Sequence, residues 1–203
     1  MRKREIENQE HRYLNRSLWS NLQSLKSTVS FMQTGAHPDD EASRLLAKLS
    51  LDYGYHVSYV NAVRGQGGQN SIGPERDDNL GALRTFELLK AMSVLRADIG
   101  WLAENRNSSI VDFGLSKSAE ETFEFWGKDY TFQRMVRLVR AYKPDIIIPT
   151  FLDINGQHGH HRAITRATIE AYDNSENSKI YKDSQFKPWK ISQIFLPAWG
   201  GGG

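Results

Sequence analysis

The sequence predicts an α/β fold in which helices flank a mostly parallel β-sheet. Short β-branched and aromatic runs alternate along the chain with longer segments whose apolar residues recur at helical spacing. The most apolar of these runs, residues 145–150, is typical of a central parallel strand that is buried on both faces. A chain of 203 residues is long enough to form one domain with a substantial core.

The first part of the chain predicts a surface helix followed by a strand, a helix and a second strand. Residues 28–33 are the first predicted strand, residues 41–51 form a helix, and residues 56–63 are the second strand. Residues 1–27 are expected to be a frayed polar tail and a short amphipathic helix lying on the domain. The helix is indicated by regularly spaced leucines, namely Leu14, Leu18, Leu22 and Leu25.

The middle of the chain adds a long helix and two weak strands. Residues 80–95 predict the helix, and residues 98–102 and 109–113 are the candidate strands. The helix takes its apolar positions from Leu83, Phe86, Leu89, Ala91 and Leu95.

The last part of the chain continues the alternation. Residues 119–126 predict a helix that opens with a capping box at Ser118, and residues 131–142 predict an amphipathic helix. After the apolar strand, a further helix is expected to end near Tyr172, and residues 190–196 resemble a last strand.

Two strand-to-helix turns hold the side chains that are best suited to chemistry. The first contains the run His37-Pro-Asp-Asp-Glu41, and the second contains His158-Gly-His-His161. Both follow predicted strands, so both belong at the carboxyl edge of the sheet, where ligand sites form. Because the chain has no cysteine, any metal must be held by His, Asp or Glu. Imidazoles and carboxylates together suit a divalent ion, preferably zinc, although an aspartate here could also simply cap a helix and the histidines could form an incidental surface patch.

Together the two turns resemble the PIG-L/LmbE-like zinc de-N-acetylases, which remove acetyl groups from N-acetylglucosamine-type substrates. The resemblance covers about residues 28–172 and implies a Rossmann-like sheet with its active site at the carboxyl edge. It also implies that His37, Asp40 and His161 are ligands of Zn²⁺. In the same pattern Asp39 is the general base, and His158 stabilises the oxyanion or helps to protonate the leaving amine.

The sequence departs from the family pattern at His160, where an acidic residue usually precedes the last ligand histidine. The partner that orients His158 is therefore expected from elsewhere in the chain, with Asp153 as the candidate. His160 could itself compete as a ligand, although neighbouring residues at a helix start rarely aim at one point.

A glycine-rich loop after the second strand is expected at the rim of the site. A dinucleotide-binding role is disfavoured because Asn70 stands where the third glycine of the fingerprint belongs. We expect Asn70, on this loop, and Arg84, on the helix that follows, to bind substrate. The alternative for Arg84 is a surface ion pair with Glu87, three residues away.

Composition excludes several classes of partner and leaves one domain. A net charge of +2 is too small to indicate nucleic acid, and no apolar run reaches the roughly 20 residues of a membrane helix. The lack of a visible signal peptide favours a cytoplasmic location. One domain is expected over residues 28–199, followed by a glycine tail at 200–203. The composition does not predict an oligomeric state.

The sequence therefore predicts a zinc-dependent amidohydrolase acting on a small N-acetylated sugar or glycoconjugate. Two alternatives remain at this stage. One is a zinc hydrolase of another amide or ester, and the other is a non-catalytic, metal-containing carbohydrate-binding module. The presence of Asp39 beside the expected ligand Asp40 speaks against the second.

Overall fold

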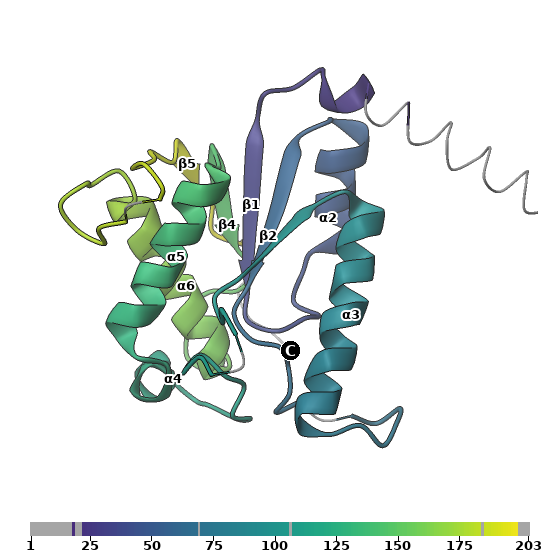
Figure 1. Ribbon diagram of the computed structural model, residues 1–203, viewed down its shortest axis with the longest axis vertical. Helices are drawn as coiled ribbons and strands as arrows, with labels where there is room; N and C mark the ends of the chain where they lie inside the picture. The colour runs from purple at the N-terminus through teal and green to yellow at the C-terminus, as the bar shows by residue number, and fades with distance from the viewer. Residues whose placement is uncertain (1–17, 19–21, 69, 106, 184, 199–203) are drawn as a thin grey trace, which may run out of the picture.

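The structure is a computed structural model that describes residues 18, 22–68, 70–105, 107–183 and 185–198. It contains one five-stranded sheet with the strand order β3-β2-β1-β4-β5, and every neighbouring pair is parallel (Figure 1). This arrangement confirms the predicted α/β fold. The strands are β1 (Ser30–Gly35), β2 (His56–Asn61), β3 (Asp98–Trp101), β4 (Ile146–Pro149) and β5 (Gln193–Ile194).

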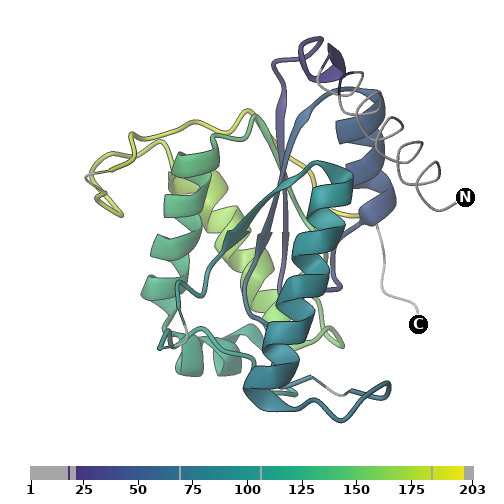
Figure 2. The ribbon, with the colours of Figure 1, turned by 45° about the vertical axis from the view of Figure 1, so that its right-hand side comes forward.

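Helices cover both faces of the sheet. Figures 1 and 2 show α2 and α3 on one side of the strands and α4, α5 and α6 on the other. Such double coverage is expected for parallel strands, because each crossover places its helix on a face of the sheet. The helices are α2 (Ser43–Ala47), its π-helical continuation η1 (Lys48–Asp52), α3 (Asp77–Leu95), α4 (Ala119–Trp126), α5 (Lys128–Tyr142) and α6 (Gly159–Asn174).

Alternate residues of β1 divide the core into two clusters. Phe31 packs with residues of α2 and α3, whereas Met32 packs with residues of α4, α5 and α6. Successive side chains of a strand point to opposite faces, so one apolar run supplies both clusters. Within the described residues, no helix is long and apolar enough to cross a membrane.

The pairing of β1 with β4 determines where the two predicted turns lie. Phe31 is in register with Ile146, and Thr34 with Pro149, so both strands end at the same level of the sheet. Beyond the strands, the amide of Thr150 donates to the carbonyl of Thr34 at 2.9 Å. The Thr34 and Thr168 hydroxyls are 2.7 Å apart and hydrogen-bonded, which joins β1 to α6.

Two predictions about the middle of the chain are wrong. Residues 109–113 form no strand, because their polar groups bond to α4 instead. The Trp126 indole donates to the Val111 carbonyl at 2.8 Å, and the Ser109 hydroxyl donates to the Trp126 carbonyl at 2.7 Å. In α3, three of the predicted apolar positions are on the exposed side, since only one side of the helix meets the sheet: Leu83, Phe86 and Leu89. Its buried residues are Leu80, Gly81, Leu88, Met92 and Leu95.

The other predicted elements are present with small shifts of their ends. Helix α3 begins three residues earlier than predicted, and β5 is reduced to two residues. The capping serine of α4 is confirmed, because the Ser118 hydroxyl accepts from the Glu121 amide at 3.1 Å. The expected amino-terminal helix falls mostly outside the described residues, within which Leu18 and residues 22–24 are helical. The glycine tail also lies outside them.

A buried arginine fixes the segment that leads from α6 to β5. Arg140 is 1% exposed, and its guanidinium donates to the Ser175 carbonyl at 3.0 Å and to the Asn177 carbonyl at 2.9 Å. It also donates to the carbonyls of Ile180 and Tyr181. One side chain therefore satisfies several backbone acceptors that the irregular segment cannot satisfy by itself.

Replacing this arginine should destabilise the protein. We expect Arg140→Met to lower the free energy of unfolding by about 2 kcal/mol or more, because the side-chain volume is kept while the carbonyls lose their donors. Urea denaturation followed by circular dichroism measures the change. Arg44→Met is the control, since Arg44 is exposed and should change stability by less than about 0.5 kcal/mol. Equal effects of the two substitutions would contradict the role given to Arg140.

Candidate metal centre

The first turn folds Asp40 back over the end of β1. One carboxylate oxygen of Asp40 accepts hydrogen bonds from the amides of Ala36 and His37, both at 2.8 Å. The Asp40 amide in turn donates to the His37 carbonyl at 3.2 Å. These bonds fix the carboxylate beside the imidazole of His37, with the Asp40 oxygen 3.6 Å from His37 Nδ1.

The second turn presents three histidines at the start of α6. His158 is the N-cap, and its Nδ1 accepts from the His160 amide at 3.2 Å. Gly159 follows in very close contact with another loop, because a Cβ placed there would lie 2.1 Å from Ser116 Oγ and 2.4 Å from the Ser118 carbonyl. Its amide donates to the Ser116 carbonyl at 2.7 Å. Only glycine allows α6 to begin so close to this loop.

The two turns bring His37, Asp40 and His161 together. His161 Nε2 lies 3.2 Å from His37 Nδ1 and 3.3 Å from the second carboxylate oxygen of Asp40. Each residue offers one ligand atom, and the three atoms lie within 4.8 Å of one another. The side chains are between 8% and 15% exposed, so the cluster is partly open to solvent.

This donor set fits a catalytic zinc ion. Two imidazoles and one carboxylate are ligand types that zinc prefers, and three protein ligands leave a coordination position open. The hydrogen bonds from the Ala36 and His37 amides to Asp40 provide the outer support that ligating carboxylates usually have.

The charges of the cluster are strongly coupled. Burial disfavours the charged form of His37, but the hydrogen bond and the negative charge of Asp40 outweigh it and raise the pKa of His37. Burial also opposes ionisation of Asp40, but hydrogen bonds to His161 and His37 hold the pKa of Asp40 far below its usual value. The carboxylate is therefore charged at neutral pH, as a metal ligand must be.

Asp39 lies apart from the ligand cluster. Its side chain is 71% exposed, and its carboxylate accepts from Arg84 Nη2 at 2.6 Å. Asp39 and Arg84 line a cavity of about 610 Å³, hereafter the Asp39 cavity, together with Gly68, Asn70, Ile72, Gly73 and Leu83 among others. The two adjacent aspartates thus point to different places, Asp40 toward His37 and His161, and Asp39 toward the cavity.

The glycine-rich loop forms one wall of the Asp39 cavity. Arg84 donates to the Gly65 carbonyl at 3.3 Å, and a Cβ on Gly65 would lie only 2.4 Å from its guanidinium. The side chain of Asn70 stabilises the next part of the loop. Its Oδ1 accepts from the backbone amides of Ile72 and Gly73, and its Nδ2 donates to the Glu75 carboxylate. Arg84 and Asn70 therefore line the same cavity. The carboxylate that pairs with Arg84 is that of Asp39, whereas the alternative considered from the sequence was an ion pair with Glu87.

The rings of His158 and His160 both pack against the ring of His37. His158 Nε2 is 3.2 Å from the Gly114 carbonyl, and burial together with the neighbouring imidazoles of His37 and His161 lowers the pKa of His158. His160 is fully buried, and its Nδ1 lies 3.1 Å from His37 Nε2. Burial and the same neighbours lower the pKa of His160 to about 2. Both rings are therefore neutral at physiological pH.

Asp153 does not orient a histidine, contrary to the expectation from the sequence. Its carboxylate accepts from Arg162 Nε at 2.6 Å and from Arg166 Nε at 2.5 Å. The buried Asp112 lies nearer the cluster, with its Oδ1 3.9 Å from His160 Nδ1. No local motif in the sequence indicates a role for Asp112, because it stands in an irregular loop.

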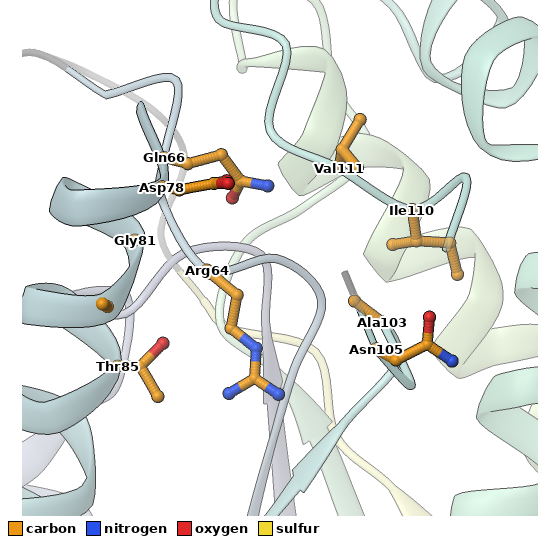
Figure 3. A pocket seen from close by; sticks show the side chains of 10 residues that line it. Arg64, Gln66, Asp78, Gly81, Thr85, Ala103, Asn105, Ile110 and Val111 are labelled. Atoms are coloured by element: carbon orange, nitrogen blue, oxygen red, sulfur yellow. The ribbon is translucent and has the colours of Figure 1, made fainter. Parts of the chain in front are cut away.

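Arg64 and Gln66, at the start of the glycine-rich loop, line a second pocket. It has a volume of about 320 Å³, and the Arg64 guanidinium within it stacks 3.6 Å above the Trp101 ring. Figure 3 shows Arg64 between the α3 wall and the loop that carries Ile110 and Val111. None of its lining residues belongs to the His37, Asp40 and His161 cluster.

Comparison with known proteins now identifies the family. Residues 32–172 match the model of the PIG-L family, which is described as GlcNAc-PI de-N-acetylase. The chain belongs to the PIG-L family. The matched region contains both turns and Arg84, so the resemblance derived from the sequence motifs is confirmed.

The proteins to which this chain is similar include two deacetylases and a hydratase. The chain is 28% identical over 181 residues to a 1D-myo-inositol 2-acetamido-2-deoxy-alpha-D-glucopyranoside deacetylase of Streptomyces scabiei, an alignment that covers 79% of this chain and 53% of that protein. The N,N'-diacetylchitobiose deacetylase of Pyrococcus horikoshii has a similar fold, with a TM-score of 0.58 and 21% identity over 82% of this chain and 59% of that one. GalB, the 4-carboxy-2-hydroxymuconate hydratase of Pseudomonas putida, also has a similar fold, with a TM-score of 0.61. Its sequence is 17% identical, and the match covers 82% of this chain and 64% of that one. This PIG-L chain thus spans little more than half the length of the curated relative.

The close contact at Gly159 predicts a site-specific substitution effect. We expect Gly159→Ala to lower the free energy of unfolding by about 2 kcal/mol, although alanine is the better helix former, because the methyl group overlaps the backbone of Ser118. Zinc affinity should fall as well, since the start of α6 carries His161. Chemical denaturation and a zinc titration with a chelator measure the two effects.

Gly73→Ala is the matched control. A methyl group there would lie 2.2 Å from a Glu75 carboxylate oxygen, at the end of a flexible side chain that can move aside, and 3.6 Å from Asn70 Nδ2, which is ordinary van der Waals contact. This variant should keep both stability and zinc affinity, whereas unchanged stability in Gly159→Ala would show that α6 can begin elsewhere.

Proposed function

We propose that the chain is a zinc-dependent amidohydrolase that removes the N-acetyl group from an N-acetylglucosamine-type sugar or glycoconjugate. The observation that carries this proposal is the convergence of His37, Asp40 and His161, next in the chain to Asp39, whose carboxylate pairs with Arg84 and lines a cavity. Membership of the PIG-L family supports the reaction, and the names of the relatives support the class of substrate.

In this proposal His37, Asp40 and His161 hold the metal. A zinc ion in such a site makes water a better nucleophile at neutral pH and polarises an amide carbonyl. Both effects are needed, because an amide is a weak electrophile and neutral water is a weak nucleophile. The protein contributes the geometry of the ligands and the open side of the cluster.

Asp39 is the proposed general base. Its carboxylate would take a proton from the attacking water as the oxygen bonds to the acetyl carbon, and would deliver it to the nitrogen as the carbon–nitrogen bond breaks. The products are then acetate and the free amine. The hydrogen bond from Arg84 holds the Asp39 side chain in place at the edge of the cavity.

His158 is the proposed stabiliser of the oxyanion. Its Nδ1 accepts the hydrogen bond from the His160 amide, so the neutral ring carries its proton on Nε2. A neutral imidazole with a proton on Nε2 is a hydrogen-bond donor. In the structure His158 Nε2 lies 3.2 Å from the Gly114 carbonyl and 3.3 Å from the Ser116 amide, and of these two groups only the carbonyl can accept its proton.

Arg84 and Asn70 are the proposed substrate-binding residues. Both line the Asp39 cavity, whose volume of about 610 Å³ is within the usual range for small-molecule sites. The guanidinium of Arg84 has several N–H donors, so it can donate to sugar oxygens while it keeps its hydrogen bond to Asp39. The loop amides beside Asn70 offer further hydrogen-bonding groups.

Substitution of each aspartate separates the base from the ligand. We expect Asp39→Asn to keep about one zinc ion per chain and to reduce turnover roughly 100-fold or more, because the amide keeps the size but loses the basicity. Asp40→Asn should instead lose most of the zinc. Metal content by mass spectrometry and amine release from a panel of N-acetylated sugars measure the two properties.

His56→Ala is the control for metal loss, because His56 is an exposed histidine at the start of β2. Zinc loss in Asp39→Asn with retention in Asp40→Asn would exchange the two roles. Zinc binding by the wild type without amine release from any sugar would favour another amide or ester, and binding of sugars without turnover would favour a carbohydrate-binding module.

Removal of Arg84 should impair catalysis without releasing metal. We expect Arg84→Met to lower kcat/KM about tenfold, because a charged hydrogen-bond donor to Asp39 and substrate is lost while the aliphatic part of the side chain remains. Steady-state kinetics and metal content measure this, with Arg44→Met as the control for loss of a surface charge. Unchanged kinetics would assign Arg84 a structural role only.

A further inference from the structure

His160 occupies the position at which this chain departs from its family, and the structure places it directly behind a proposed zinc ligand. We propose that His160 is a positioning residue: its ring accepts the Nε2 proton of His37 and thereby directs the Nδ1 lone pair of His37 toward Asp40 and His161. The inference rests on the proposed metal centre and assigns the tautomer that this centre requires.

The contacts of His37 divide between its two ring nitrogens. Nδ1 faces the ligand cluster, at 3.2 Å from His161 Nε2, whereas Nε2 faces His160 Nδ1 at 3.1 Å. His160 thus lies on the opposite side of the ring from the other two ligands. It meets His37 as a hydrogen-bond partner on the outer side of the cluster.

Counting protons shows why this contact matters. A neutral imidazole carries one proton, on either nitrogen. If the proton of His37 is on Nε2, it is donated to His160 Nδ1, and His37 Nδ1 is free to bind a metal. If the proton is on Nδ1, it points at His161 and occupies the position where the metal must bind.

The ring of His160 also forms, with His37 and His158, a second group of side chains close enough to hold a metal ion, so its surroundings decide between a ligand and a positioning role. The residue is 0% exposed, and its ring lies 4.9 Å from the Trp126 ring and 4.5 Å from the Phe113 ring, measured between centroids. Asp112 approaches Nδ1 only to 3.9 Å, and its nearer oxygen already accepts from the Gly114 amide at 3.0 Å. His37 is therefore the nearest hydrogen-bond partner of His160 Nδ1 in the described part of the chain.

The other ring nitrogen of His160 supports the same assignment. Its Nε2 is buried and has no hydrogen-bond partner among the described residues. Leaving a buried polar atom unpaired is unfavourable, and an apolar residue would fit the aromatic surroundings without this loss. The hydrogen bond that Nδ1 accepts from His37 therefore accounts for a histidine at this position. When Nδ1 accepts, the proton of His160 is on Nε2.

Two substitutions separate this role from packing. His160→Leu fills the aromatic surroundings with an apolar side chain but removes the hydrogen-bond acceptor. His160→Asn retains an acceptor, because the asparagine Oδ1 can occupy the position of the histidine Nδ1. We expect His160→Leu to weaken zinc binding 10- to 100-fold, as is typical when an outer-shell partner is lost, and His160→Asn to stay within about threefold of the wild type. Competition with a chelator measures the affinities, and thermal unfolding of the metal-free proteins reports their stability.

Nitrogen-15 spectra of the histidine rings test the tautomer directly in the zinc-loaded wild type. His37 should carry its proton on Nε2 and His160 its proton on Nε2, and His160→Asn identifies the His160 signals by their disappearance. This measurement decides the question even if His160→Leu does not fold.

Three results would overturn the inference. The first is a proton on Nδ1 of His37 in the zinc-loaded protein. The second is equal zinc affinity of His160→Leu and the wild type. The third is a loss of zinc affinity in His160→Asn as large as in His160→Leu, which would make His160 a ligand. A wild type that binds no zinc would overturn the proposed function as well. A wild type that binds zinc with unaffected variants would overturn only the role of His160.

Discussion

The parallel pairing of β1 with β4 is the constraint on which the site depends. Residues far apart in the chain reach one edge of the sheet because Thr34 and Pro149 are in register and both strands end there. The bond from the Thr150 amide to the Thr34 carbonyl extends this pairing into the loops. The contact of the Thr168 hydroxyl with Thr34 then holds α6 over the same strand. A shift in register would separate His161 from His37 and Asp40.

Around this edge, backbone amides and a buried ring contact the proposed metal ligands. Backbone amides of Ala36 and His37 hold the Asp40 carboxylate, and the buried ring of His160 contacts the far side of His37. The start of α6 is fixed by the contact of Gly159 with the Ser116 loop. Charged and imidazole ligands are costly to bury alone, so a supporting layer of this kind allows them to remain only partly exposed.

The same edge separates the proposed metal ligand from the proposed general base. Asp40 is held inside the turn, while Asp39 extends into a cavity and pairs with Arg84 from α3. Adjacent residues in a tight turn point in different directions, which lets one short motif serve two elements of the site. The hydratase that shares this fold shows that the sheet alone does not decide the reaction, so the function must be argued from the side chains.

The sequence by itself determined the fold class, most of the strands and helices, and the cluster of ligand candidates, because each depends on residues close together in the chain. Periodicity placed β1, β4 and α5 to within a few residues, and the two histidine turns followed from the strands before them. Only the tertiary structure decided which side of α3 is buried, that Asp39 pairs with Arg84 across 45 positions, and that His160 meets His37 across 123 positions. Asp153 and residues 109–113 were predicted wrongly for the same reason, since their hydrogen-bond partners come from α6 and α4. Such contacts depend on how the helices pack on the sheet, and no local pattern of residues encodes that packing.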